Sequence, residues 1–105
     1  MAMRPKVDLP HAAIAAFCRK WSIVELAFFG SILRGDFRPD SDIDVLVRFA
    51  PGVDYGLLTY ARMVNELSDV VGCNVDLVSR DDIERSTNWI RRQEILNSAQ
   101  LYYAA

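Results

Sequence analysis

The amino-acid sequence predicts an α/β (α+β) fold, in which helices pack on a small mixed β-sheet. Three observations support this prediction. Segments 22–29 and 43–49 are rich in β-branched and aromatic residues, which is typical of strands. Segment 57–71 has apolar residues at helical spacing and ends before Gly72. A third short strand is predicted at 74–78, so strands alternate with helices along the chain.

The composition indicates a globular protein and excludes several functional classes. The 105 residues are 51% hydrophobic and 25% charged, which predicts a single domain over residues 1–105. The net charge of −2 gives no basic excess, so general nucleic-acid binding is not expected. No apolar run is long enough to form a membrane span or a signal peptide, and Cys18 and Cys73 match no zinc spacing. We therefore expect a cytoplasmic protein with reduced thiols.

The first half of the chain is expected to form a helix, a strand, a short helix and a second strand. Asp8 is a candidate helix cap, and Pro10 suits the first turn of the helix that follows. The strand at Ser22–Phe29 ends at Gly30. Ser31–Gly35 is long enough for one or two helical turns, and Phe37–Ser41 is a predicted loop. The sheet should be mixed, because this connection is too short for a parallel crossover.

The second strand, Ile43–Phe49, has two distinct faces. Alternation places Asp42, Asp44, Leu46 and Arg48 on one face. The other face carries only apolar side chains and should meet the core; its members are Ile43, Val45, Val47 and Phe49.

The second half of the chain should contain a helix at Leu57–Val71, a strand at Asn74–Val78 and a mostly helical end. Ser79 resembles the start of a capping box, so a helix is expected from Arg80 to about Tyr102, with a break near residues 87–88. Most of the large apolar residues in this end should lie in the core: Trp89, Ile90, Ile95, Leu96, Leu101, Tyr102 and Tyr103. Tyr102 and Tyr103 would form an interaction patch if exposed. Arg85, Arg91 and Arg92 are interpreted as a solvated helix face, with contact to an acidic partner or RNA as the lesser alternative.

Three carboxylates are candidate metal ligands. Asp42 and Asp44 project from one strand face, about 6.6 Å apart along the chain. Their like charges favour a bound cation. Asp76 lies between Val75 and Leu77, and it would join the pair if its strand lay beside the second strand. Converging carboxylate oxygens suit Mg²⁺ or Mn²⁺.

The Gly30-Ser31 turn is a candidate phosphate site. Glycine lets the backbone approach a ligand, and the first N–H groups of a following helix point toward an anion. The Ser31 hydroxyl and the Arg34 guanidinium would add a donor and a positive charge. Phosphates between this turn and metal-bound carboxylates would fit in-line phosphoryl or nucleotidyl transfer with two metal ions.

These motifs resemble those of the DNA polymerase beta superfamily of nucleotidyltransferases. Gly30-Ser-Ile-Leu-Arg-Gly35 and Ser41-Asp-Ile-Asp44, followed by Val75-Asp-Leu77, resemble the minimal nucleotidyltransferase (MNT) group. The resemblance covers nearly the whole chain. One departure is Leu33, where the family usually has alanine, and this affects local packing more than chemistry.

The resemblance implies a polymerase-beta-like palm fold and a role for each motif residue. Asp42 and Asp44 would hold two Mg²⁺ ions, or Mn²⁺, and Asp76 would complete one metal shell and help to take a proton from the attacking hydroxyl. Gly30 and Ser31 would hold the triphosphate of ATP, and Arg34 would contact phosphate or substrate. Members of this group are often antitoxins that transfer AMP from ATP to a tyrosine of a partner HEPN-domain ribonuclease toxin, with which they assemble.

Three other functions stay open. The protein could neutralise its toxin by binding alone, although all three carboxylates of the motif are present. It could modify a small molecule, as aminoglycoside nucleotidyltransferases do, although 105 residues leave no room for the acceptor domain of those enzymes. It could also be a structural domain whose acidic cluster is incidental.

Overall fold

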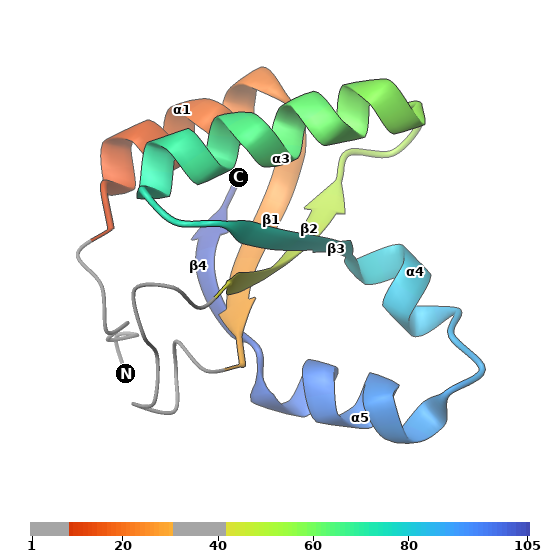
Figure 1. Cartoon of the computed structure of the whole chain (residues 1–105). Coiled ribbons are helices and arrows are strands. Elements are labelled where there is room, and N and C mark those ends of the chain that lie inside the picture. The colour runs from red at the N-terminus through yellow and green to blue at the C-terminus, as the bar shows by residue number, and fades with distance from the viewer. Residues whose placement is uncertain (1–8, 31–41) are drawn as a thin grey trace.

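A four-stranded mixed sheet forms the centre of the protein (Figure 1). The computed structural model describes residues 9–30 and 42–105. The strands are β1 Ile23–Phe29, β2 Ile43–Phe49, β3 Val75–Ser79 and β4 Gln100–Ala104. Their order in the sheet is β3-β2-β1-β4. β1 pairs antiparallel with both β2 and β4, whereas β2 and β3 are parallel, so the predicted mixed sheet is confirmed.

Two helices cover one face of the sheet and enclose the main core. Figure 1 shows α1 His11–Lys20 and α3 Leu57–Val71 side by side on this face. The apolar face of β2 points toward them, as its alternation predicted, and Val45 and Val47 are fully buried. The core residues contributed by the helices are Ile14, Phe17, Cys18, Met63 and Leu67. Burial raises the pKa of the Cys18 thiol to about 12, so it stays protonated at neutral pH.

Two helices near the C-terminus lie against the opposite face of the sheet (Figure 1). They are α4 Arg80–Glu84 and α5 Trp89–Ser98. Each contributes one buried isoleucine to a second, smaller core, which consists of Ala27, Phe29, Leu46, Ile83 and Ile95. This face of β2 also carries Asp42, Asp44 and Arg48, so the residues of chemical interest share the α4/α5 side of the sheet.

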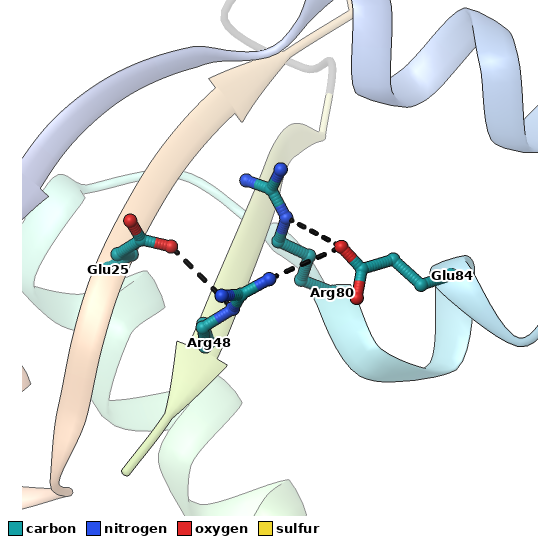
Figure 2. Close-up of polar contacts among 4 residues, drawn as sticks. All are labelled: Glu25, Arg48, Arg80 and Glu84. Carbon is teal, nitrogen blue, oxygen red and sulfur yellow. Dashed lines mark hydrogen bonds and ion pairs between the residues drawn. The ribbon is translucent and has the colours of Figure 1, made fainter.

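A network of ion pairs joins α4 to the sheet (Figure 2). Arg48 of β2 lies between two carboxylates, with 3.6 Å from its Nε to Glu25 Oε1 and 3.2 Å from its Nη2 to Glu84 Oε2. Arg80 also reaches Glu84 Oε2, at 3.2 Å. We name these four residues the arginine network. Its two guanidinium groups and two carboxylates balance in charge.

The predicted bounds of β2 and α3 are confirmed to the residue. Gly72 ends α3 in the left-handed conformation, with φ of 77°, and its N–H donates to the Ser68 carbonyl. The helix predicted from Arg80 does begin there, but the Ser79 side chain makes no capping hydrogen bond. The prediction of a cap at Asp8 with Pro10 in the first helical turn was wrong, because α1 begins at His11 and Pro10 is its N-cap. The short helix predicted at Ser31–Gly35 and the loop at Phe37–Ser41 lie outside the described residues.

The prediction of a helical C-terminus to about Tyr102 was wrong beyond Ser98. Residues 100–104 form β4, whose Leu101 and Tyr103 pair with Ala27 and Leu26 of β1. The open edge of β1 offers hydrogen-bonding groups that a fourth strand satisfies, and this long-range pairing overrides local helix propensity. The expected break falls between α4 and α5, near residues 87–88.

The prediction that most large apolar residues of this end are buried holds in part. Ile95 is buried, and Leu96, Tyr102 and Tyr103 are partly buried against the two cores. Three others are more than half exposed: Trp89, Ile90 and Leu101. A helix packed on the outer face of a sheet buries only one stripe of its side chains, so Trp89 and Ile90 on the other side of α5 are exposed to water. No helix among the described residues has the length and apolar character to span a membrane.

Candidate active site

Asp42 and Asp44 lie at the start of β2, on the α4/α5 face of the sheet. Asp42 is exposed immediately before the strand, and Asp44 is partly buried within it. Between them, Ile43 is fully buried on the opposite face. The apolar residues therefore fix the orientation of the strand, and the two aspartates are held on the same side of the sheet.

Asp76 lies beside Asp44 on the neighbouring strand. The parallel register of β2 and β3 pairs Asp44 with Asp76, so their backbones are about 4.8 Å apart. Val75 and Leu77, on either side of Asp76, are buried in the main core, and Asp76 itself is exposed on the opposite face. The strand order therefore places Asp76 beside Asp44, as expected, whereas a shared site formed by the three carboxylates and its chemical role stay predictions.

Gly30 brings the end of β1 against the Asp44 carboxylate. It has φ of +79°, a conformation that residues with a side chain rarely adopt. A Cβ atom at this position would lie 2.1 Å from Asp44 Oδ2. The preceding residue, Phe29, pairs with Asp44 across the two strands. The glycine is therefore required both for the turn and for the space that the Asp44 side chain occupies.

An open cleft of about 410 Å³ lies between this turn and helix α5. Phe29, Gly30 and Asp44 line its sheet side. The helix side consists of Arg91, Glu94, Ile95 and Ser98, and Gln100 of β4 completes the lining. The cleft thus contains the predicted glycine and one predicted carboxylate, together with polar groups from α5.

The α5 residues were missed as candidate site residues in the sequence. Arg91, Glu94 and Ser98 follow the three- and four-residue spacing of one helix flank, next to buried Ile95. That spacing could have shown that they share a flank, but only the fold shows that this flank faces Asp44.

The interpretation of three arginines as one solvated helix face holds in part: Arg85 and Arg91 are exposed and Arg92 is half-buried, but Arg85 ends α4 whereas the other two lie in α5. Arg85 pairs with Asp82 at 2.8 Å, and an Arg92 Nη1 donor contacts the Ser86 carbonyl at 3.2 Å. Of the three, only Arg91 lines the cleft at Asp44. The break between α4 and α5 separates the arginines, because it rotates one helix relative to the other.

A larger hollow of about 960 Å³ lies at the other end of β2, around Arg48 and Tyr55. Its arginines, Arg48 and Arg85, are ion-paired to carboxylates. Nearby Tyr60 donates its hydroxyl to the Leu77 carbonyl at 2.8 Å. Burial first, and then the negative charges of Asp82 and Asp76, raise the Tyr60 pKa to about 12. Because Arg48, Arg85 and Tyr60 are bound to other groups of the protein, they are less available to a ligand than the polar groups of the smaller cleft.

The donor set at Asp44 fits a hard divalent cation. Carboxylate oxygens are the ligands that Mg²⁺ and Mn²⁺ prefer, and Asp42, Asp44 and Asp76 lie at adjacent positions on one sheet face. Within residues 9–30 and 42–105, however, no three side chains already converge as a metal site. The other two predicted site residues, Ser31 and Arg34, lie outside the described residues.

A family model described as nucleotidyltransferase domain matches residues 12–102. Among curated relatives, a protein of Methanocaldococcus jannaschii provisionally named protein adenylyltransferase MJ0128 is 38% identical over 65 residues. Protein adenylyltransferase MntA of Thermococcus cleftensis is 32% identical over 65 residues. Each alignment covers 62% of this chain and 64% of the relative, so the chain matches just under two thirds of their length.

Solved structures share the fold. A protein provisionally identified as a minimal nucleotidyltransferase superposes with a TM-score of 0.65 at 33% identity, covering 86% of each chain. A toxin–antitoxin structure with AMP-PNP gives a TM-score of 0.69 at 20% identity, covering 92% of this chain and 75% of that one. A complex of the tri-AMPylated HEPN toxin of Shewanella oneidensis with its MNT antitoxin gives 0.61 at 21% identity, covering 90% and 70%.

Proposed function

The chain belongs to the nucleotidyltransferase domain family, and from this premise we propose that it is a Mg²⁺-dependent enzyme that transfers AMP from ATP to a tyrosine of a HEPN-type toxin. One observation carries the proposal: Asp42, Asp44 and Asp76 occupy one sheet face, and the Gly30 turn closes directly on Asp44. The protein would act as the antitoxin and would assemble with its target.

The three carboxylates would hold the metal ions. Asp42 and Asp44 would contribute ligands from β2, and Asp76 would complete the shell from β3. Bound Mg²⁺, or Mn²⁺ in its place, would supply positive charge to the phosphates and to the attacking and leaving oxygens. Without a cation, three neighbouring carboxylates would repel the triphosphate, so nucleotide binding should require the metal.

The turn after β1 would hold the phosphates. Gly30 has no side chain, so the backbone can lie close to a bound group. Ser31 and Arg34 would add a hydroxyl donor and a fixed positive charge, as their positions in the motif imply. This assignment would place the triphosphate in the cleft that Gly30 and Asp44 line together.

The acceptor hydroxyl would approach from outside the chain. Asp42 and Asp76 are both exposed, and an exposed Asp76 carboxylate would be accessible to accept a proton from an incoming hydroxyl. The proton would pass to the Asp76 carboxylate as the hydroxyl oxygen bonds to the α-phosphorus, and pyrophosphate would leave. An acceptor carried by another protein suits this open arrangement.

The named relatives support the same substrate and partner. The relatives from Methanocaldococcus and Thermococcus are named protein adenylyltransferases. Two neighbours of the same fold come from toxin–antitoxin structures, one with AMP-PNP and one with a tri-AMPylated HEPN toxin. These names favour ATP over other nucleotides and a toxin over a small-molecule acceptor.

The direct test uses α-labelled ATP and Mg²⁺ with the product of the neighbouring gene. The wild-type protein should label that product, and Asp42→Asn should not. Tyrosine variants of the target would identify the acceptor, and chelation of Mg²⁺ should abolish the label. Full labelling by Asp42→Asn would overturn the assignment of the metal ligands. If no nucleotide is transferred with Mg²⁺ or Mn²⁺ but the toxin is still neutralised, the protein acts by binding alone.

A further inference from the structure

Helix α5 places one cation opposite the candidate metal site. Arg91 lines the same cleft as Gly30 and Asp44, although it lies 47 residues after Asp44 in the chain. We infer that Arg91 binds the phosphates of the nucleotide and is a second phosphate-binding arginine besides Arg34. This inference rests on the proposed function, because it adds a residue to the same site.

The position of Arg91 is fixed by the packing of its helix. Asn88 caps α5 by accepting a hydrogen bond from the Arg91 N–H at 3.2 Å. One turn later, Ile95 is buried against the sheet in the second core. The backbone that carries the guanidinium is therefore held at both ends of this turn, and only the side chain has to move to meet a ligand.

The charge of Arg91 is not used by the fold. Three other arginines on the α4/α5 side, Arg48, Arg80 and Arg85, form ion pairs with carboxylates. Within the described part of the chain, no carboxylate forms an ion pair with Arg91, although Glu94 is only three residues away on the same flank. An arginine that lines a cleft without a structural partner is available to an anionic ligand.

The neighbouring charges specify where such an anion would lie. The Glu94 carboxylate lines the same flank of the cleft, three residues after Arg91, and it repels phosphate. Phosphates that enter the cleft are therefore favoured near the Arg91 guanidinium and disfavoured beside Glu94. A guanidinium can donate two parallel hydrogen bonds to phosphate oxygens, which lysine cannot do.

The inference is tested by measuring MgATP binding to wild type, Arg91→Gln, Arg91→Lys and Arg85→Gln. Arg91→Gln should raise the Kd at least about tenfold, the usual effect of losing a charge-assisted contact. Arg91→Lys should recover part of the affinity. Arg85→Gln removes the same charge from a site outside the cleft, and it should bind like wild type. Arg91→Gln and Arg91→Lys should keep the wild-type melting temperature.

The outcomes separate the inference from the proposed function. If wild type binds no MgATP, the proposed function fails and this inference fails with it. If wild type binds and Arg91→Gln binds equally well, only the role of Arg91 is overturned. A loss of binding that Arg91→Lys does not reduce, or that comes with a lower melting temperature, would show that the side chain supports the fold instead of contacting phosphate.

Discussion

The two ends of strand β2 carry charge on the same face of the sheet but in opposite arrangements. At the C-terminal end, Arg48 lies between Glu25 and Glu84, and every charged group of the arginine network has a partner (Figure 2). At the N-terminal end, Asp42, Asp44 and Asp76 lie on one sheet face, with Asp44 and Asp76 paired in register. No basic side chain of residues 9–30 or 42–105 forms an ion pair with Asp42 or Asp76.

The difference indicates which end serves the fold and which serves a ligand. Paired charges add modestly to stability and leave little for a substrate to bind. A group of like charges does not help the fold, because each carboxylate disfavours ionisation of the next. We therefore expect substitutions at the acidic end to affect transfer and substitutions in the arginine network to affect stability.

The largest expected effect is on transfer, in Asp76→Asn. Loss of the proposed metal ligand and proton acceptor should lower the rate of the proposed AMP transfer by roughly 10²–10⁴-fold. The free energy of unfolding should be unchanged or slightly higher, because Asp76 is exposed and one like charge is removed. Single-turnover labelling and chemical denaturation measure the two quantities. If Asp76→Asn lost stability together with activity, the assignment of the acidic end of β2 to a ligand would be contradicted.

Gly30→Ala should affect both stability and transfer. Its φ of +79° is strained for alanine, which costs about 1 kcal/mol, and its Cβ would meet Asp44 Oδ2. Moving that carboxylate by about 1 Å should lower transfer on the order of 10²-fold. The matched control is Gly52→Ala, which has φ of +84° but no atom within 4 Å of the added Cβ.

The control should show a similar loss of stability with normal transfer. Thermal unfolding and initial rates of labelling, measured on both variants, separate backbone strain from displacement of the Asp44 side chain. Equal transfer by the two alanine variants would mean that the close approach at Gly30 has no role in the reaction.

Arg48→Met should lower stability without affecting transfer. Methionine keeps much of the aliphatic stem but leaves Glu25 and Glu84 without this guanidinium, which should cost about 1 kcal/mol. Arg85→Met, whose exposed ion pair joins residues only three apart, should cost less. Urea denaturation of both variants tests the order, and the labelling assay should give wild-type rates. A slow Arg48→Met enzyme would mean that the two ends of β2 are coupled.

The smallest effect is expected from an ion pair that belongs to neither end of β2. Glu66 of α3 accepts hydrogen bonds from Lys20 and from Trp21 Nε1, and these contacts lower its pKa below the usual 4.5. A carboxylate with a lowered pKa stabilises the fold above about pH 4.5 and loses that contribution as the pH falls further. Glu66→Gln should therefore cost a few tenths of a kcal/mol at pH 7 and less near pH 3.

Denaturation curves of wild type and Glu66→Gln at several pH values measure this difference. A difference that stays constant from pH 7 to pH 3 would show that the glutamine is destabilising for reasons other than charge. Transfer should be unaffected at pH 7, because Glu66 joins α1 and α3 on the face of the sheet opposite the acidic end.

Much of the fold could be predicted because its signals are local. β2 has apolar residues at every second position and two charged residues among the others, and α3 repeats apolar residues at helical spacing before a glycine, so both were found to the residue. β4 was missed because Gln100–Ala104 has no clear alternation, and pairing with β1 makes it a strand. The exposed side chains Trp89 and Ile90 were taken for core because composition cannot show which stripe of a helix is buried.

The sequence by itself determined that Asp42 and Asp44 share a strand face and that Gly30 ends the strand before them. Both follow from backbone geometry over a few residues. Only the tertiary structure decided that Asp76 lies beside Asp44, that a side chain at Gly30 would collide with that carboxylate, and that Arg91 faces the same cleft. These are contacts between distant segments, and they depend on strand order and helix packing, which no local pattern specifies.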